Sequence, residues 1–577
     1  MRFSICRPSN HIMFRRFSTF LILPVVSFAI AVSFPSAATS TTQLSVPKVT
    51  PPAAETPQWW YQSGATRAAA NGAMAGKAKN VILFLGDGMS FTTVAAARIL
   101  EGQRNAATGE ENVLSWEHFP ATAFSKTYNT DAQTADSAGS MTAITSGVKT
   151  HRGAIGVSAG QRNDCVDSLG KSLLTWLTLA DSAGMATGII TTTRITHATP
   201  AALYAHTPER HWESDANLPE AAKAGGCRDI AQQLLTSTRY GRGPLVVLGG
   251  GRAQFMPAHQ HDPEYAERTG LRLDGRDLIE EWKRAHPNGA YVWNTHQFNA
   301  DAGAPALLGL FEPSHMQFEH DRDRHPNGEP SLAEMTRTAI QSLSRDPHGF
   351  VLMVEGGRID HAHHAGNAYR ALDETIALSD AVRAAVQTAP KDTLIIVTAD
   401  HAHTLNFVGY PVRGNPILGK VRSSSRDAGD RTQYAHDLNA LPYTTLTYAN
   451  GPGHTAASNT QSAGTKHFNH QPSTYELVRG RPDLTTIDTQ APDYLQEALV
   501  PLKKESHSGE DVGIWATGPG SAAFRGVLEQ HVIYHVIVQA TPALRQRLCA
   551  AGTCNAAGVP IKLPQLADFE RKDQSRE

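Results

Sequence analysis

The sequence is poor in cysteine and in net charge, and each shortage excludes a class of protein. Only five cysteines occur in 577 residues, and none lies in a C-x-x-C pair, which argues against zinc held by thiolates. The net charge is −2, with no basic stripe, so we expect no nucleic-acid partner. The last residues, 566–577, are charged, which excludes a hydrophobic lipid-anchor signal there. No internal repeat is present.

The N-terminal residues 1–38 are predicted to be a signal peptide that is removed. Arg15 and Arg16 precede a largely apolar run over 17–34, and small residues follow it. A membrane anchor is the alternative, but a proline and several serines interrupt the run. We therefore expect export to the periplasm or the medium, with no stable membrane anchor. Cys6 would be lost, and an even set remains, compatible with two disulfides in an oxidising compartment. The remaining cysteines are Cys165, Cys227, Cys549 and Cys554.

From about residue 78, short apolar runs alternate with stretches of helical periodicity. Continuously apolar runs of this length are typical of strands buried on both faces of a sheet. Apolar residues at three- and four-residue spacing over 331–344 and 368–388 predict helices. We expect an α/β fold, a three-layer α/β/α sandwich around a large, mostly parallel sheet. The predicted strands are 81–85, 187–191, 245–248, 350–354, 394–397, 511–515 and 532–539.

The composition of the sequence changes between about 408 and 500, where apolar runs are few. A structureless loop of that length is improbable in a compact domain, so an inserted subdomain is predicted. The predicted organisation is a leader and N-terminal arm at 39–77, a catalytic domain at 78–407 and 501–545, an insertion at 408–500, and a C-terminal tail at 546–577.

Carboxylates and imidazoles gather directly after several of the predicted strands. Ligands of open α/β sheets bind outside the carboxyl ends of the strands, where these residues fall. Asp360 and His364 are four residues apart, so a helical turn would place both on one face. Surface ion pairs are the alternative for any single residue, but the set indicates a metal site. Mixed imidazole and carboxylate ligands suit zinc, and carboxylate with hydroxyl suits magnesium. The residues are Asp87, Glu355, Asp360, His364, Asp400 and His401.

A candidate nucleophile, Ser137, precedes a predicted helix that ends at Gly147. A serine at a helix N-terminus faces the positive end of the helix dipole, where phosphate also binds well. The alternative is an ordinary N-cap serine. A nearby metal ion would make this hydroxyl a nucleophile at ordinary pH.

Taken together, these motifs resemble the alkaline phosphatase family. The resemblance runs in family order from about residue 79 to 540 and covers most of the chain after the leader. The motifs are Gly86-Asp87-Gly88, T-A-D-S-A around Ser137, H-A-T-P-A-A from His197, E-G-G from Glu355 with D-x-x-x-H from Asp360, T-A-D-H ending at His401, and H-S-G-E-D from His507.

The resemblance implies hydrolysis of phosphate monoesters to an alcohol and inorganic phosphate through a phosphoserine at Ser137. It implies two zinc ions and one magnesium ion per subunit, with Ser137 beside a zinc ion. Arg210 would hold two phosphate oxygens in the bidentate manner that suits guanidinium. The implied ligands are Asp360, His364 and His507 for one zinc, Asp87, Asp400 and His401 for the other, and Asp87, Thr199 and Glu355 for magnesium.

Further features resemble the animal branch of the family. His197 and His361 occupy two positions that vary between branches, beside the metals. The resemblance pairs Cys165 with Cys227 and Cys549 with Cys554, and implies a homodimer in which Tyr410, in a crown-like insertion, reaches the partner's active site. His363 and His403 are expected to lie behind the ligands or to face solvent. The residues matching a calcium site are Glu264, Phe311, Glu312 and Glu329, the last replacing the usual aspartate.

Two other functions compete with this interpretation. A phosphodiesterase or sulfatase of the same superfamily would share the metal ligands. A sulfatase should show a Cys- or Ser-x-Pro-x-Arg motif, which is absent around Ser137. A diesterase has less need of Arg210, which suits the extra anionic oxygen of a monoester. A catalytically silent zinc- or phosphate-binding protein would need neither Ser137 nor the magnesium ligands.

Overall fold

The computed structural model describes residues 55–422, 434–455, 464–469 and 481–571. The described residues all belong to the second of the chain's two units, Ala54–Glu577. The signal peptide predicted at 1–38 lies outside the described residues. No described helix is long and apolar enough to span a membrane.

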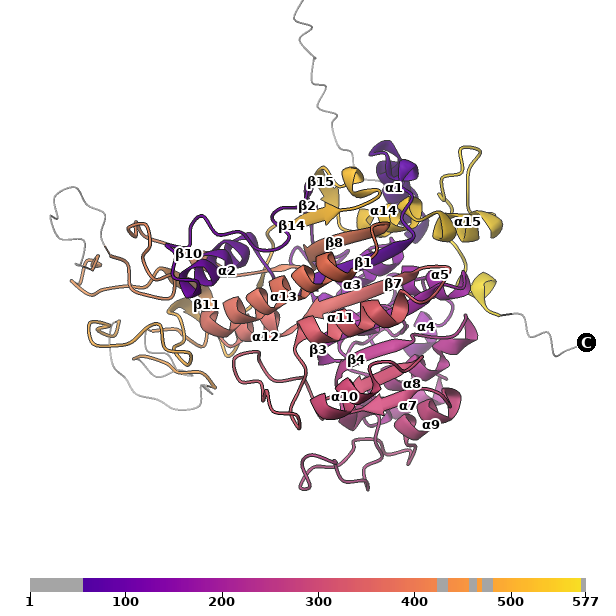
Figure 1. Ribbon diagram of the computed structural model, residues 1–577, viewed down its shortest axis with the longest axis horizontal. Helices are drawn as coiled ribbons and strands as arrows, with labels where there is room; N and C mark the ends of the chain where they lie inside the picture. The colour runs from indigo at the N-terminus through magenta and orange to yellow at the C-terminus, as the bar shows by residue number, and fades with distance from the viewer. Residues whose placement is uncertain (1–54, 423–433, 456–463, 470–480, 572–577) are drawn as a thin grey trace, which may run out of the picture. The chain divides into compact units, whose positions relative to one another are not determined.

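A ten-stranded sheet forms the centre of the second unit (Figure 1). Its strands follow the order β15-β2-β14-β8-β1-β7-β3-β4-β6-β5. Only β14 runs antiparallel to its neighbours, β2 and β8, in the described sheet, so the predicted mostly parallel arrangement is confirmed. The strands are β1 (Asn80–Gly86), β2 (Ala121–Lys126), β3 (Ala186–Arg194), β4 (Val246–Gly250), β5 (Ala290–Val292), β6 (Leu307–Leu310), β7 (Phe350–Gly356), β8 (Thr393–Ala399), β14 (Val512–Thr517) and β15 (Gly526–Glu529).

Helices cover both faces of the sheet, so every residue of the central strands β1, β7 and β8 is buried. In β1, Val81, Leu83 and Leu85 pack into one hydrophobic core, whereas Ile82 and Phe84 pack into the other. The first core is closed mainly by α3, α5, α8 and α14, and the second by α2, α11 and α13. Figure 1 shows α11 and α13 lying over one face of the sheet. The predicted three-layer sandwich is therefore confirmed.

The helices predicted at 331–344 and 368–388 are confirmed as α11 and α13. The helices of the described chain are α1 (Pro57–Ala70), α2 (Phe91–Arg104), α3 (Ser137–Ser146), α4 (Cys165–Ser168), α5 (Trp176–Ser182), α6 (Ala198–Ala201), α7 (Glu220–Ala224), α8 (Ile230–Thr236), α9 (Leu278–Ala285), α10 (Thr295–Asp301), α11 (Leu332–Leu343), α12 (Arg358–His364), α13 (Ala368–Thr388), α14 (Val532–Ala540) and α15 (Pro542–Ala550).

The strand predicted over 532–539 is wrong, because that segment forms α14. All nine residues of α14 are buried, and the helix packs between α1 and α3. A short apolar run that is buried on every side has the same sequence pattern as a buried strand, so periodicity could not distinguish the two. The last strand of the sheet along the chain is instead β15, a four-residue strand of which only Leu528 is buried.

Two small sheets lie outside the large one. In the first, β10 (Leu405–Phe407) pairs with β11 (Leu446–Gly451), and β11 pairs with β12 (Ala498–Pro501). The second has two short strands, β9 (Ala402–His403) and β13 (His507–Ser508). The second pairing brings two distant histidine-bearing segments together. Both expected disulfides, Cys165–Cys227 and Cys549–Cys554, are present.

Candidate active site

The carboxyl ends of β1, β7 and β8 meet at one edge of the sheet and carry its polar residues. Gly86 of β1 is in register with Gly356 of β7 and with Ala399 of β8. Asp87 and Asp400 therefore follow neighbouring strands at the same level. Gly88 has φ of 71°, and a Cβ there would lie 2.3 Å from the ring of His403, so the turn after β1 requires glycine.

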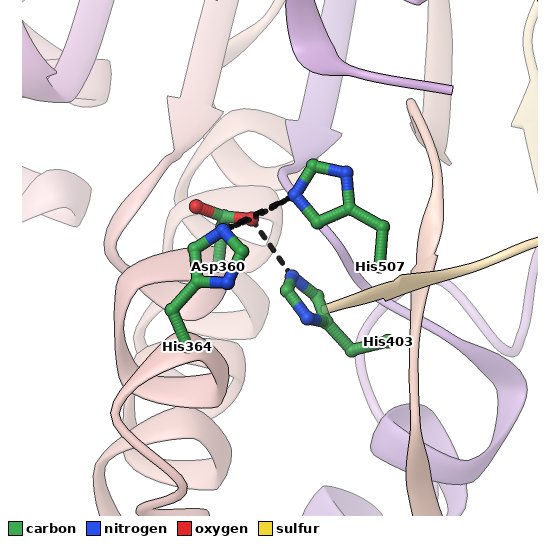
Figure 2. Close-up of side chains that lie close together, drawn as sticks. All are labelled: Asp360, His364, His403 and His507. Carbon is green, nitrogen blue, oxygen red and sulfur yellow. Dashed lines mark hydrogen bonds and ion pairs between the residues drawn. The ribbon is translucent and has the colours of Figure 1, made fainter. Parts of the chain in front are cut away.

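One group of side chains converges on the carboxylate of Asp360 (Figure 2). Its Oδ1 lies 3.3 Å from Nε2 of His364 and 3.2 Å from Nε2 of His507. Nε2 of His403 is closer, at 2.7 Å. Asp360 and His364 lie one turn apart on α12, as predicted, while β9 and β13 carry His403 and His507.

The two outer histidines are oriented as metal ligands usually are. Nδ1 of His364 lies 2.5 Å from the carbonyl oxygen of Glu505, and Nδ1 of His507 lies 2.8 Å from that of Ala135. A ring that donates from Nδ1 keeps the lone pair of Nε2 free. Both Nε2 atoms point at Asp360, so Asp360, His364 and His507 form a donor set that suits zinc.

His403 has a different chemical state, because carboxylates flank both ring nitrogens. Nδ1 lies 2.5 Å from Oε2 of Glu505, opposite Asp360. Burial lowers the pKa of His403, but Glu505 and Asp360 outweigh it and raise this pKa to about 10. His403 is thus a charged donor that orients Asp360. His363 is also buried, against Thr93 and Tyr448, so the alternative that either ring faces solvent is wrong.

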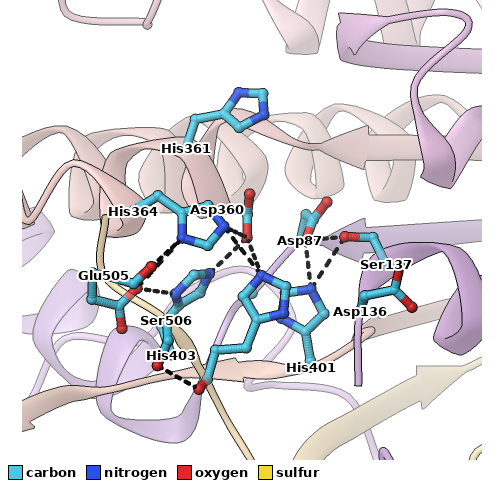
Figure 3. Close-up of polar contacts among 12 residues, drawn as sticks. Asp87, Asp136, Ser137, Asp360, His361, His364, His401, His403, Glu505 and Ser506 are labelled. Carbon is cyan, nitrogen blue, oxygen red and sulfur yellow. Dashed lines mark hydrogen bonds and ion pairs between the residues drawn. The ribbon is translucent and has the colours of Figure 1, made fainter. Parts of the chain in front are cut away.

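A second group surrounds the hydroxyl of Ser137 (Figure 3). Nε2 of His401 lies 3.3 Å from Oδ1 of Asp87 and 3.2 Å from Oδ2 of Asp400. The Oγ of Ser137 is 3.2 Å from the same Nε2 and 3.5 Å from Asp87 Oδ1. Burial, followed by repulsion from Asp400, raises the pKa of Asp87. Crowded buried carboxylates of this kind favour a bound cation.

Ser137 is the first residue of α3, and the N-cap is Asp136. The carboxylate of Asp136 accepts a hydrogen bond from the Gly139 amide at 3.1 Å. The N-cap interpretation of Ser137 is therefore wrong, and its hydroxyl is directed to the Asp87 group instead. The remaining oxygen of Asp136 lies 3.1 Å from Nη1 of Arg210, which brings the guanidinium to the mouth of the site.

A third group contains a buried carboxylate with an unpaired oxygen. Oε2 of Glu355 accepts hydrogen bonds from Thr191 and Thr193, while Oε1 has no partner among the described residues. Burial raises the pKa of Glu355 to about 8. Thr199 Oγ1 lies 3.4 Å from Oδ2 of Asp87. An unpaired buried carboxylate oxygen beside a hydroxyl and a second carboxylate suits magnesium.

A cleft of about 800 Å³ opens onto the first two groups, and Ser137, Arg210, Asp360 and His507 help to line it. The alkaline phosphatase family model matches residues 78–543. That match covers most of the sequence. The chain belongs to the alkaline phosphatase family. Its members hydrolyse phosphate monoesters and depend on metals, and this chain is a phosphoric monoester hydrolase of that family.

Several alkaline phosphatases are similar to this chain in sequence or structure. The tissue-nonspecific isozyme of Gallus gallus is 42% identical over 500 residues, 85% of this chain and 89% of the relative. The alkaline phosphatase of Gadus morhua is 42% identical over 474 residues, 80% of this chain and 92% of the relative. The solved structure from Thermus thermophilus covers 81% of this chain and 92% of its own, with 25% identity and a TM-score of 0.56. The solved structure from the Antarctic bacterium TAB5 covers 81% of this chain and 98% of its own, with 22% identity and a TM-score of 0.52. A variant of the TAB5 enzyme was solved with magnesium bound.

Three histidines form a further cluster at the edge of this alkaline phosphatase site. His197, His315 and His361 hold ligand-type atoms within 4.8 Å of one another. Each ring faces an arginine: Nε2 of His197 lies 3.3 Å from Arg210, and Nδ1 of His361 lies 2.9 Å from Arg358. Arginine can only donate, so Nδ1 of His361 accepts and Nε2 carries the proton. A protonated nitrogen cannot ligate a metal, so His361 is a hydrogen-bond donor.

The carboxylates predicted for calcium also lie together in this alkaline phosphatase. Burial, followed by repulsion from Glu312, raises the pKa of Glu329. Burial raises the pKa of Glu264 as well, although Arg252 lies 3.0 Å from it. Phe311 immediately precedes Glu312, after β6. The three acidic side chains therefore form one partly buried group.

Sequence reasoning missed Asp136, His315 and Glu505 as members of the site. Asp136 adjoins Ser137, and an aspartate before a predicted helix is a usual cap signal that could have identified it. Glu505 lies two residues before His507, but nothing in the sequence indicates that it contacts His403. No local sequence pattern marks His315 as a site residue, because its neighbours His197 and His361 come from distant segments.

Proposed function

We propose that Ser137 is the nucleophile of this alkaline phosphatase. The supporting observation is the position of its Oγ, 3.2 Å from His401 Nε2 and 3.5 Å from Asp87 Oδ1, in the cleft that Arg210 lines. The Oγ attacks phosphorus, the ester P–O bond breaks, and the alcohol leaves with a proton. Water then cleaves the phosphoserine, restoring the hydroxyl and releasing inorganic phosphate.

Arg210 and the first turn of α3 hold the transferring phosphoryl group. The free amide groups of a helix N-terminus favour an anion, and α3 begins at Ser137 itself. Arg210 supplies parallel donors for two phosphate oxygens, and Asp136 fixes its position. Phosphoryl transfer depends chiefly on positioning and charge neutralisation, which these groups provide.

Three metal positions are supported by the donor chemistry. We assign zinc to Asp360, His364 and His507 and to Asp87, Asp400 and His401, and magnesium to Asp87, Thr199 and Glu355. The unpaired Oε1 of Glu355 and the raised pKa of Asp87 support the need for cations. When bound, these ions act as Lewis acids that stabilise negative charge on oxygen and lower the pKa of a hydroxyl. His403 and Glu505 keep Asp360 oriented.

A calcium ion is proposed at Glu264, Glu312 and Glu329, with the carbonyl oxygen of Phe311 as a further ligand. The raised pKa values of Glu264 and Glu329 support it, because a divalent cation would relieve their repulsion. Removing calcium alone should lower the unfolding temperature, and the variant Glu329→Gln should abolish that dependence. An unfolding temperature that does not respond to calcium would contradict the assignment.

We also propose that the protein forms a homodimer and is exported from the cytoplasm. Tyr410 is 85% exposed, which supports a contact with a second subunit through the crown-like insertion at 408–500. Sedimentation should give a dimer, and Tyr410→Ala should change the KM, because it alters the partner's cleft. The signal peptide at 1–38 supports export to the periplasm or the medium; mass spectrometry of the mature N-terminus tests it.

The nucleophile is tested with p-nitrophenyl phosphate and acid-quenched labelling above pH 8. The native protein should give a phosphoenzyme on Ser137, and Ser137→Ala should give none and lose almost all activity. Ser146→Ala is the matched control, because Ser146 ends the same helix and, among the described residues, its hydroxyl donates only to the carbonyl oxygen of Thr142. Full activity in Ser137→Ala would exclude the mechanism, and faster cleavage of bis(p-nitrophenyl) phosphate would favour a diesterase.

A further inference from the structure

The cleft is lined by cationic side chains besides Arg210. Arg210 already faces the site from beside Asp136. Arg152 and Lys504 line the same cleft, and both are exposed. Neither side chain has a hydrogen bond or an ion pair with any other described residue. Arg162, also on the cleft, differs because Asp131 neutralises it.

Arg152 lies on the Asp136 side of the site. The amide of the next residue, Gly153, donates to Oδ2 of Asp136 at 3.0 Å, the oxygen that also contacts Arg210. The backbone amide of Arg152 donates to Asp131 at 2.9 Å. The backbone is therefore fixed at the mouth, while the guanidinium is free to meet a ligand.

Lys504 lies on the side of the His364 and His507 ligands. The amide of Glu505 donates to the carbonyl oxygen of His364 at 2.9 Å, and the Glu505 carbonyl faces His364 Nδ1. These two contacts fix the backbone next to Lys504 against α12. The Glu505 carboxylate pairs with the His403 ring and accepts a hydrogen bond from Thr404, so it does not neutralise Lys504.

We propose that Arg152 and Lys504 form a second anion subsite, which favours phosphate monoesters whose leaving group bears its own negative charge. The inference rests on the proposed monoesterase activity and names its substrate class. A cleft of about 800 Å³ leaves room for a leaving group beyond the phosphate. Two unpaired cations on separate walls attract an anionic leaving group both before and after binding.

The test uses two substrates that differ only at the terminal group of the leaving alcohol. Glycerol 3-phosphate ends in a neutral hydroxymethyl group, and 3-phosphoglycerate ends in a carboxylate. The measured quantity is kcat/KM for 3-phosphoglycerate divided by kcat/KM for glycerol 3-phosphate, both at the same ionic strength. The variants are Arg152→Gln, Lys504→Gln and the double variant. Lys503→Gln is the matched control, since it is exposed, adjacent, and not on the cleft.

Each single variant should lower the ratio roughly two- to fivefold, as for a solvent-exposed ion pair. The double variant should lower it by roughly tenfold if the two cations act independently. Lys504→Arg and Arg152→Lys should restore most of the ratio, and Lys503→Gln should leave it unchanged. An unchanged ratio in both single variants, or an equal fall in Lys503→Gln, overturns the subsite. Loss of the proposed function would appear separately, as failure to hydrolyse glycerol 3-phosphate.

Discussion

Nη1 of Arg210 lies 3.1 Å from Oδ2 of Asp136, and the other oxygen of Asp136 caps the helix that begins with Ser137. One carboxylate therefore positions both Arg210, the proposed phosphate-binding arginine, and Ser137, the proposed nucleophile. Burial would raise the pKa of Asp136, but Arg210 and the amides of Gly139 and Gly153 hold it below its usual value. Asp136 is therefore ionised at neutral pH.

Replacing Asp136 should weaken phosphate binding more than it slows chemistry. Asp136→Asn keeps an N-cap but loses the charge that holds Arg210, so the guanidinium becomes more mobile. We expect the inhibition constant of inorganic phosphate to rise by roughly three- to tenfold, the scale of one charge-assisted hydrogen bond. Asp136→Ala should in addition destabilise α3. Equal phosphate inhibition in the native protein and Asp136→Asn would contradict this role of Asp136.

Removing His403 should weaken binding of the zinc ion that we propose at Asp360. His403→Gln takes away the imidazolium between Asp360 and Glu505, and partners behind metal ligands typically contribute 10- to 100-fold in affinity. Competition with a chelator, followed by elemental analysis, measures the zinc retained. His363→Gln is the control, because that ring stacks on His403 but bonds to Thr93 and Tyr448. Equal zinc loss in both variants would assign the effect to packing.

Lys149 should make the protein more stable as the pH rises. Burial lowers the pKa of Lys149 to about 8 although Glu529 lies 3.0 Å away, because desolvation outweighs that attraction. Between about pH 8 and 10.4 the unfolded chain binds more protons than the folded one, so the free energy of unfolding rises with pH, by on the order of 3 kcal/mol for this group.

Lys149→Met should remove this pH dependence. Its free energy of unfolding, measured in urea from pH 7.5 to 10.4, should rise less steeply than that of the native protein. Lys126→Met is the control, because Lys126 contacts the same Glu529 at 3.1 Å but is exposed. Parallel curves for the native protein and Lys149→Met would show that the buried ammonium does not titrate in this range.

The two disulfides should contribute unequally to stability. Cys165–Cys227 closes a loop of 62 residues and Cys549–Cys554 one of 5. A longer loop restricts the unfolded chain more, so we expect losses of about 4 and about 2 kcal/mol when each pair becomes alanine. Chemical denaturation of the metal-loaded variants measures both. A larger loss for the short loop would show that its native contacts dominate.

The sequence alone predicted six of the ten strands of the sheet, including its central ones, and the place of the site residues that follow them, but β2, β5, β6 and β15 were not predicted. Continuous apolar runs such as 81–85 and 394–397 require burial on both faces, and parallel strands end at one edge. That geometry brought Asp87 and Asp400 together without any knowledge of tertiary contacts. The four-residue spacing likewise placed Asp360 beside His364. Resemblance to a family, rather than spacing, was needed for Arg210 and His507.

Only the tertiary structure decided which partners surround these residues and which of the surrounding groups carry a charge. Pairing of β9 with β13 brings His403 opposite His507 across more than a hundred residues of chain, and such pairing leaves no local pattern. His403 becomes a charged donor because Glu505 arrives from the same distant segment. The segment 532–540 forms a helix that packs against α1 and α3, whereas a strand there would have had to pair with an edge of the sheet. Local sequence sets which groups are available, and long-range packing sets their partners, burial and charge.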